Sequence, residues 1–471
     1  MLFVVVVVVL ALVAAVSGDQ GVFSLELAGQ PIDELWVLTC AVLVFMMQAG
    51  FLCYEVGLAR PIHATVVAVK NVVDWTISTV GFFCIGFALM FGESFAGIIG
   101  TDMFLLSGAA DQASSVGGLT FFLFQLAFAG TAITLVSGSL VERTSMLAYS
   151  IIAIALAVVI YPIYGHWVWG NLLVAENQPW LAELGFHDFA GGTVVHLLGA
   201  VVALVGILLV GPRIGRFNSD GSPNEMKGSN VPLALLGIVI LWFGWWGFNG
   251  GSFLRFDGNV GRAILVTNIS AVAGLVGAGF SGYLFQKSYA LNMKLVGGAI
   301  GGLVAITPGA DVVTPVGALA VGLVAGVVYS FSNDFLLRMG IDDALGVIPA
   351  HGFGAIWGTL ALAIFAADGS FGDRSVIAQL GIQALGVGVC IVWAAVTSFV
   401  FYGLTQLVIG LRMSPREEVL GFELESQVWP YKIRSKPNRQ PPSAPPAGTP
   451  VVRAEAPVTP ISSGGGAHGE R

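Results

Sequence analysis

Long apolar segments recur along most of this chain, and no other feature constrains its fold more strongly. Eleven of them reach or approach the roughly 20 residues that an α-helix needs to cross a bilayer. We expect them at 33–57, 64–91, 118–140, 145–170, 188–210, 231–252, 260–285, 293–307, 313–336, 344–366 and 375–411. Only 10% of the residues are charged, whereas soluble domains carry about 25%. The sequence therefore predicts an all-α polytopic membrane protein with eleven transmembrane helices.

The basic residues of the connecting loops predict its orientation. Nine Lys and Arg residues fall in loops on one side of the membrane and three on the other. Because positive loops stay in the cytoplasm, the N-terminus is expected outside and the C-terminus inside. We thus predict a multi-pass protein of the cell (plasma or inner) membrane. The net charge of −8 gives no reason to expect a nucleic-acid partner.

The two ends of the chain differ from the transmembrane domain expected at 19–412. Residues 1–18 carry a short apolar run followed by small residues, which is typical of a signal peptide; a short uncleaved anchor is the alternative. Residues 413–430 are expected to form a cytoplasmic regulatory segment. Residues 431–471 are rich in Pro, Gly and Ser, which predicts a disordered cytoplasmic tail without a signalling domain.

Two segments of related pattern each place a histidine inside an apolar helix. In "DFAGGTVVHLLGA" Asp188 precedes His196 by eight residues, and in "DALGVIPAHGFGA" Asp343 precedes His351 by eight. The two segments begin the fifth and tenth helices, which run in opposite directions. This pattern predicts a 5+5 inverted repeat, helices 1–5 and 6–10, followed by a long eleventh helix. The repeat would bring both imidazoles together near the middle of the membrane.

Such a histidine pair favours a path for a small polar molecule. Polar groups at that depth are costly and usually functional, although a helix–helix hydrogen bond is the simpler alternative for either one alone. Burial disfavours the charged ring, so the pair should hold one shared proton at most. No third ligand lies nearby in sequence, so we expect no metal.

Aromatic side chains cluster toward the outer ends of three predicted helices. Phe124 and Phe128 share one helix face, Trp169 ends the fourth helix, and the sixth ends with Trp245, Phe248 and Ser252. Interfacial aromatics often only anchor a helix. Converging aromatic faces with a hydroxyl would instead bind a small cation through cation–π contacts.

The chain resembles the ammonium transporter (Amt/Mep/Rh) family, on its Amt branch. The resemblance rests on "FMMQAGFLCYEVGL", "VKNVVDW", "FQLAFAGTAITLVSGSLVER", "DFAGGTVVHLLGA", "GWWGFNGGS", "TNISAVAG" and "HGFGAIWGTLA", in that order. It implies a homotrimer with one pore in each subunit. It also implies an outer ammonium recruitment site formed by Phe124, Phe128, Trp169 and Ser252, with Asp188 as a nearby acid. The gate and pore that it implies are formed by Phe128, Phe248, His196, His351 and Trp245.

The implied mechanism is binding of ammonium, its deprotonation below the gate, and movement of ammonia past the histidines, with or without the proton. No cofactor is implied, and no enzyme motif is visible. The alternative is an ammonium-binding membrane sensor with little flux, which the tail does not favour. A gas channel of the Rh side is disfavoured by Trp169 and Ser252.

Three further points accompany the resemblance. Asp188 also suits a capping role, because an acid before a helix satisfies free N–H groups. The family often carries a second acid three residues after the position of Asp343, but here Gly346 stands there, so Asp343 should have fewer partners. A cytoplasmic PII signal protein is a further possible partner, and Arg213, Arg216 and Lys227 could contact it.

Overall fold

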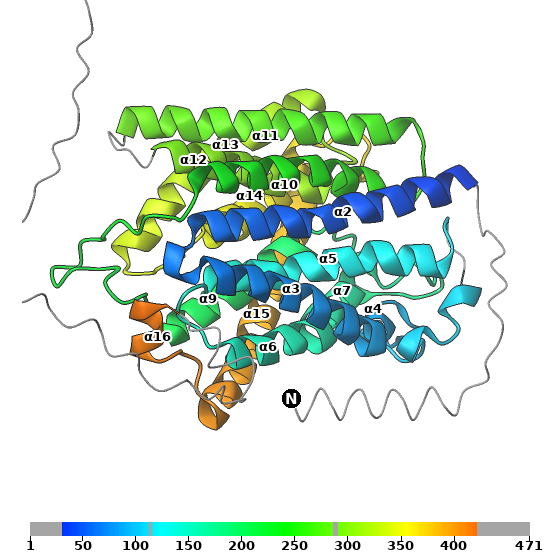
Figure 1. Cartoon of the computed structure of the whole chain (residues 1–471). Helices are drawn as coiled ribbons and strands as arrows, with labels where there is room; N and C mark the ends of the chain where they lie inside the picture. The colour runs from blue at the N-terminus through cyan, green and yellow to red at the C-terminus, as the bar shows by residue number, and fades with distance from the viewer. Residues whose placement is uncertain (1–30, 113–114, 286–290, 422–471) are drawn as a thin grey trace, which may run out of the picture. The chain divides into compact units, whose positions relative to one another are not determined.

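A computed structural model of the chain describes residues 31–112, 115–285 and 291–421. The predicted signal peptide, the tail and residues 422–430 of the predicted regulatory segment lie outside these residues. The described part is built almost entirely of helices, with long helices lying roughly parallel (Figure 1). The prediction of an all-α polytopic membrane protein is confirmed.

The long helices follow the expected order of spans. The first half of the chain contains α2 (Pro31–Leu58), α3 (Ala64–Gly81), α4 (Phe87–Phe91), α5 (Gly118–Ser139), α6 (Met146–Ala155), α7 (Tyr161–Trp169) and α9 (Leu198–Val210). The second half contains α10 (Val231–Gly251), α11 (Gly258–Phe285), α12 (Leu291–Ile306), α13 (Pro315–Arg338), α14 (Gly354–Phe365) and α15 (Val376–Val408). Wide π-type turns continue several of these helices, namely η2 (Phe82–Gly86), η5 (Leu156–Ile160), η6 (Gly192–Leu197) and η8 (Ile348–Phe353).

Short elements occupy the connections. They are the helices α8 (Trp180–Glu183) and α16 (Pro415–Leu420), the 3-10 turns η1 (Pro61–His63), η3 (Phe104–Leu106), η4 (Ala109–Asp111) and η7 (Thr307–Gly309), and the strands β1 (Ser94–Phe95) and β2 (Ile99–Gly100). The two strands pair antiparallel, with Ser94 opposite Gly100.

Ten helices of the described residues are long and apolar enough to cross a membrane. The expected eighth span, 293–307, corresponds to α12, which has 16 residues and so measures about 24 Å at 1.5 Å per residue. It is shorter than a typical span, and the expected count of eleven is not confirmed. The physical reason is the Pro308–Gly309 break, where the helix tightens into η7.

The fifth and tenth spans begin four residues later than predicted. Expected at 188 and 344, they begin at Gly192 and Ile348. Gly191 has a φ of +101°, a backbone conformation that ends any helix and that glycine adopts without strain. Both spans then start with a π-turn, which holds one more residue than an α-turn and is frequent at functional sites.

Close contact between backbones positions the first and sixth spans. A Cβ atom on Gly237 of α10 would lie 2.5 Å from the carbonyl oxygen of Gly50 and 2.5 Å from the amide nitrogen of Tyr54, both on α2. Such small residues let membrane helices approach closely. Accordingly, α2 lies alongside α10 in Figure 1.

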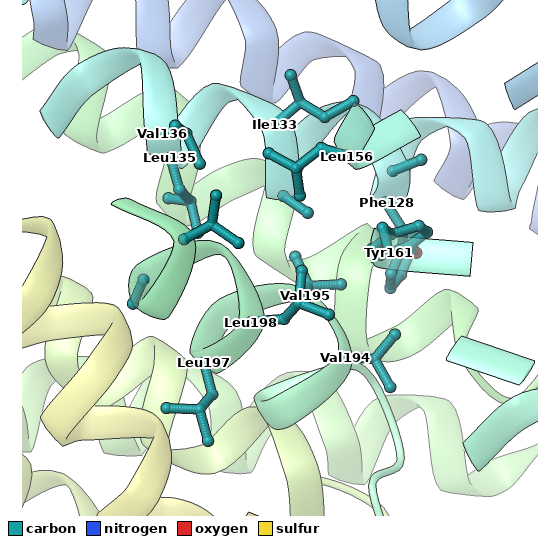
Figure 2. Packing of buried hydrophobic residues seen from close by; sticks show 14 of the residues in the cluster. Phe128, Ile133, Leu135, Val136, Leu156, Tyr161, Val194, Val195, Leu197 and Leu198 are labelled. Carbon is teal, nitrogen blue, oxygen red and sulfur yellow. The ribbon is translucent and has the colours of Figure 1, made fainter. Parts of the chain in front are cut away.

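Apolar packing fixes the helix that carries the first histidine. Val194, Val195 and Leu198 around that histidine are fully buried, and they pack with Leu135 of α5 and Leu156 of η5 in the cluster of Figure 2. Because protein interiors are packed like crystals, this cluster leaves the π-turn η6 little freedom to move.

Candidate functional site

We define two ends of the helix bundle by their residues. The aromatic end carries Trp169, Asp188 and Ser252, and the arginine end carries Arg143 and Asp342. The predicted site residues extend from the aromatic end toward the middle of the bundle.

A line of aromatic rings begins at the aromatic end. The centroids of Phe124 and Phe128 lie 4.7 Å apart, and Trp169 meets Phe128 edge-on at 6.1 Å. Phe128 and Phe248 then stack with centroids 3.9 Å apart and planes inclined by 22°. All four rings are at most 5% exposed. The stacked pair therefore lies buried between the aromatic end and the interior of the bundle.

Ser252 lies at the end of α10 beside this group. Its hydroxyl donates to the carbonyl oxygen of Phe248 at 2.8 Å. A Cβ atom on the preceding Gly251 would lie 2.7 Å from the ring of Phe124. The hydroxyl oxygen keeps its lone pairs and can still accept a hydrogen bond from a cation.

Asp188 organises the start of the fifth span. Its carboxylate accepts hydrogen bonds from the backbone N–H groups of Gly191, Gly192, Thr193 and Val194 at 2.7–3.0 Å, and from the Thr193 hydroxyl at 2.6 Å. The carbonyl of Asp188 accepts from the indole of Trp169 at 2.7 Å. The side chain thus satisfies the free N–H groups of the helix start, and the backbone carbonyl of the same residue joins Trp169 to the start of the fifth span.

His196 and His351 lie against each other below the stacked phenyl rings. Their Nδ1 atoms are 3.2 Å apart, although 155 residues separate them in sequence. The ring of His196 also stacks on Phe248 at 5.5 Å and on Trp245 at 5.0 Å. Because a hydrogen bond between two Nδ1 atoms needs one donor and one acceptor, the pair is stable when exactly one Nδ1 carries a proton. The Nε2 atom of His196 has no hydrogen-bond partner in the described structure.

Three hydroxyl groups that the sequence analysis missed support these residues. The Trp245 indole donates to the Thr307 hydroxyl at 2.8 Å. The Tyr164 hydroxyl donates to Thr193 at 3.0 Å. Thr307 lies in the "ITPG" break of an apolar run, and that polar interruption was the available signal. Tyr164 had no such signal, because tyrosine is common near helix ends.

The second acid, Asp343, has fewer partners than Asp188, in line with glycine at position 346. One carboxylate oxygen accepts from the Ile348 N–H at 2.6 Å, and the other has no partner among the described residues. Burial raises the pKa of Asp343 to about 6, despite the backbone hydrogen bonds that lower it. The two halves of the repeat are therefore chemically unequal.

Buried ion pairs connect the loops of the arginine end. Arg143 and Arg213 both reach the carboxylate of Asp342, at 3.1 and 2.8 Å, and Arg216 reaches it at 3.2 Å. Burial alone would raise the pKa of Asp342, but the hydrogen bonds and charge of Arg213, together with the charge of Arg143, hold it well below its ordinary value. Glu142 pairs with Arg60 and Arg213.

This network corrects one expectation. Arg213 is 6% exposed and Arg216 is half-buried, so neither offers a free charge to a cytoplasmic partner. The sequence could not show this, because the acids that bind them come from other loops. Lys227 is exposed.

A small cavity lies on the far side of the histidine pair from the phenyl rings. Its volume is about 20 Å³, and His351, Trp245 and Glu55 are among its lining residues. That volume holds about one water molecule. Among the described residues no three His, Cys, Asp or Glu side chains come together as a metal site would require.

Comparisons with known proteins identify the family that this chain resembles. The family model described as "Ammonium Transporter Family" matches residues 35–427. "Ammonium transporter Amt2" of Archaeoglobus fulgidus is 38% identical over 438 residues, which cover 89% of this chain and 92% of that protein. Proteins similar over nearly the whole chain are thus named as transporters and not as enzymes.

Solved structures show the same fold. A structure titled "Sensor Amt Protein" is 42% identical with a TM-score of 0.82, and the match covers 84% of this chain and 98% of that one. Mep2 of Saccharomyces cerevisiae is 27% identical with a TM-score of 0.75, covering 84% of this chain and 92% of its own.

Proposed function

The chain belongs to the ammonium transporter family, and from that membership we propose that it recruits ammonium, removes one proton and conducts ammonia. The cation binds at the aromatic end among Phe124, Phe128, Trp169 and Ser252. Ring faces attract it by cation–π interaction, and the buried charge of Asp188 favours it electrostatically from behind the helix start. In this proposal the aromatic end faces outward and the arginine end faces the cytoplasm of the cell.

The stacked rings of Phe128 and Phe248 form the gate, and His196, His351 and Trp245 line the pore below it. The contact between the two Nδ1 atoms at 3.2 Å is the observation that carries the proposal. A buried neutral pair offers one donor and one acceptor to ammonia, whereas ammonium would bring an unbalanced charge into an apolar passage. Ammonium therefore loses its proton near the gate, and ammonia continues.

The assembly we propose is a homotrimer in the cell membrane with one pore in each subunit. Exposed apolar side chains along α2, α10, α11 and α15 would face lipid or neighbouring subunits. A PII signal protein at the arginine end is a further proposed partner. The exposed Lys227 can contact it, whereas the buried Arg213 cannot.

A second candidate function is ammonium sensing with little flux. The observation that favours it is the 42% identity to a protein titled "Sensor Amt Protein". A sensor would use the same aromatic site but would not need an open path past the histidines.

The test is the current evoked by an ammonium pulse on a solid-supported membrane that carries the reconstituted protein. Wild type is compared with the double variant His196→Ala, His351→Ala. We expect a current that is lost, or that becomes permissive to potassium, in the double variant. Luminal alkalinisation without current would indicate neutral ammonia conduction. Ammonium binding with neither signal would overturn transport in favour of sensing.

A further inference from the structure

His187 stands directly before Asp188 at the aromatic end, and the proposed function gives it no role. Its Nε2 atom lies 3.0 Å from a carboxylate oxygen of Asp311. Asp311 follows the turn η7 in the second half of the chain. The side chains of His187 and Asp311 are 27% and 17% exposed, so the pair is partly shielded from solvent but not sealed from it.

Neighbouring elements hold this histidine in place. The N–H of His187 donates to the side-chain oxygen of Gln383 at 2.9 Å, and its carbonyl accepts from the amide nitrogen of the same residue at 2.7 Å. Gln383 lies on α15 and is fully buried. The ring of Phe371 meets the imidazole edge-on, with centroids 5.6 Å apart. A charge on the imidazole therefore acts on its surroundings from a fixed position.

The imidazole is open to the solution at the aromatic end. An open pocket of about 720 Å³ is lined by His187 together with Asp373 and Arg374. Protons from that side therefore reach this ring directly. The two pore histidines differ in this respect, since His196 and His351 are at most 4% exposed.

Acidic groups dominate the surroundings of the ring. The charged residues on the elements around it are Glu183, Asp188, Asp311, Asp368, Asp373 and Arg374, whereas α15 carries no charge. Burial lowers the pKa of His187, but the charge and hydrogen bond of Asp311 and the charge of Asp188 outweigh burial and raise the pKa above its ordinary value of 6.5. The ring is thus positively charged in acid and becomes neutral as the pH rises.

Two contacts connect this histidine with the aromatic site for ammonium. Asp188, the next residue, accepts the hydrogen bond of the Trp169 indole through its carbonyl. The ring of Phe189 lies 4.8 Å from that of Phe253, which follows the end of α10. The charge of His187 therefore lies beside the carboxylate that favours the cation in the proposed function.

We propose that His187, held by Asp311, sets the affinity of the outer ammonium site and lowers that affinity as the outer solution becomes acidic. This inference rests on the proposed function, because it requires the cation to bind at the aromatic end. A neutral imidazole leaves the carboxylates of Asp188 and Asp311 to attract the cation. An imidazolium opposes that attraction, since like charges repel. By linkage, bound ammonium disfavours the protonated ring by the same factor.

The test measures the ammonium concentration that evokes half of the maximal current on a solid-supported membrane, with equal pH on both sides, from pH 8.5 to pH 5.5. Ammonium remains the main species throughout this range, so the supply of substrate changes little. For wild type we expect the half-saturating concentration to rise about 5-fold toward acid pH. In His187→Gln, whose side chain is neutral at every pH, it should stay near the wild-type value at alkaline pH.

Two further variants separate the charge of the ring from its packing. Asp311→Asn removes the carboxylate that favours the imidazolium, so the midpoint of the rise should move to lower pH, a shift that a purely structural role would not cause. This variant also serves if His187→Gln does not fold. Asp373→Asn is the matched control, an exposed acid that lines the same pocket, and it should reproduce the wild-type rise and midpoint.

The outcomes decide the inference and the proposed function separately. The inference is overturned if the wild-type half-saturating concentration does not rise in acid, if it rises equally in His187→Gln, or if the midpoint does not move in Asp311→Asn. If wild type gives no current at any pH, transport is overturned and ammonium binding decides the inference. Binding is then measured as the rise in melting temperature in ammonium chloride relative to sodium chloride at equal ionic strength. Weaker binding in acid for wild type but not for His187→Gln supports the inference, and any other pattern overturns it.

Discussion

At the scale of single residues, Asp188 has an observed structural role and a proposed electrostatic one. Five hydrogen bonds occupy its two oxygens, so it has little capacity left to bind ammonium directly. Its negative charge nevertheless stays close to the ring site through Trp169. The capping role and the electrostatic role that the sequence suggested are thus compatible.

We expect Asp188→Ala to lose ammonium transport and to lower the free energy of unfolding by about 3 kcal/mol or more, because four buried N–H groups lose their acceptor. Asp188→Asn should retain more stability but still lose transport, since it removes the charge. Uptake assays and thermal unfolding in detergent measure the two effects. Glu183→Ala, an exposed acid at the same end, is the control, and uptake in Asp188→Asn equal to that of the control would contradict the electrostatic role.

At the scale of helices, the backbone approach of α2 and α10 sets the register of the two halves. A Cβ atom on Gly237 would meet backbone atoms of Gly50 and Tyr54 on α2, and backbone atoms cannot move aside as a flexible side chain can. These two helices are the first spans of their respective halves. Their contact consequently fixes the position of one half relative to the other. This relative position in turn places the fifth and tenth spans side by side.

We expect Gly237→Ala to destabilise the protein by about 1–3 kcal/mol through overpacking, with reduced transport because the helices must separate. Gly403→Ala is the matched control, since a Cβ atom there meets nothing within 4 Å. Alanine should leave that helix unchanged or slightly more stable. Thermal unfolding of both variants in the same detergent makes the comparison, and equal melting temperatures would show that α2 and α10 tolerate separation.

At the scale of the whole molecule, the ion pairs of the arginine end join loops from both halves. Asp342 of the second half binds Arg143 and Arg213 of the first half. Glu418 of α16 accepts hydrogen bonds from the Ile214 N–H and from Arg412. Charged groups therefore join the two halves and the segment after α15 at the arginine end.

This network predicts a specific loss of stability in acid. The pKa of Asp342 is lower in the folded state than its ordinary value of 3.8. The ionised carboxylate of Asp342 contributes its full stabilisation of the folded state above pH 3.8. That stabilisation is lost as the pH falls below this value toward the folded-state pKa. We expect Asp342→Asn to lower the free energy of unfolding at pH 7 by about 3–5 kcal/mol, and so to lower the melting temperature. Between pH 5 and pH 3 the variant should lose less stability than wild type.

Melting temperatures across that pH range test the prediction. Glu225→Gln, an exposed loop acid, should follow the wild-type curve. Parallel curves for Asp342→Asn and wild type would mean that other carboxylates cause the loss in acid.

The sequence alone determined the class of fold and the residue types of the site. An apolar run of spanning length is a local property, and a bilayer accepts such a run only as a helix, because backbone groups must be satisfied within the segment. The eight-residue spacing from Asp188 to His196, and from Asp343 to His351, is equally local. It was therefore visible without any knowledge of the packing.

Only the tertiary structure decided how these groups meet. The contact of His196 with His351, the stacking of Phe128 on Phe248, and the burial of Arg213 each join residues more than a hundred positions apart. Such contacts depend on helix register, and small residues such as Gly237 set that register through backbone contact. The π-turns and the cavity between His351 and Glu55 have no sequence signal at all, because both arise from the way neighbouring helices fill space.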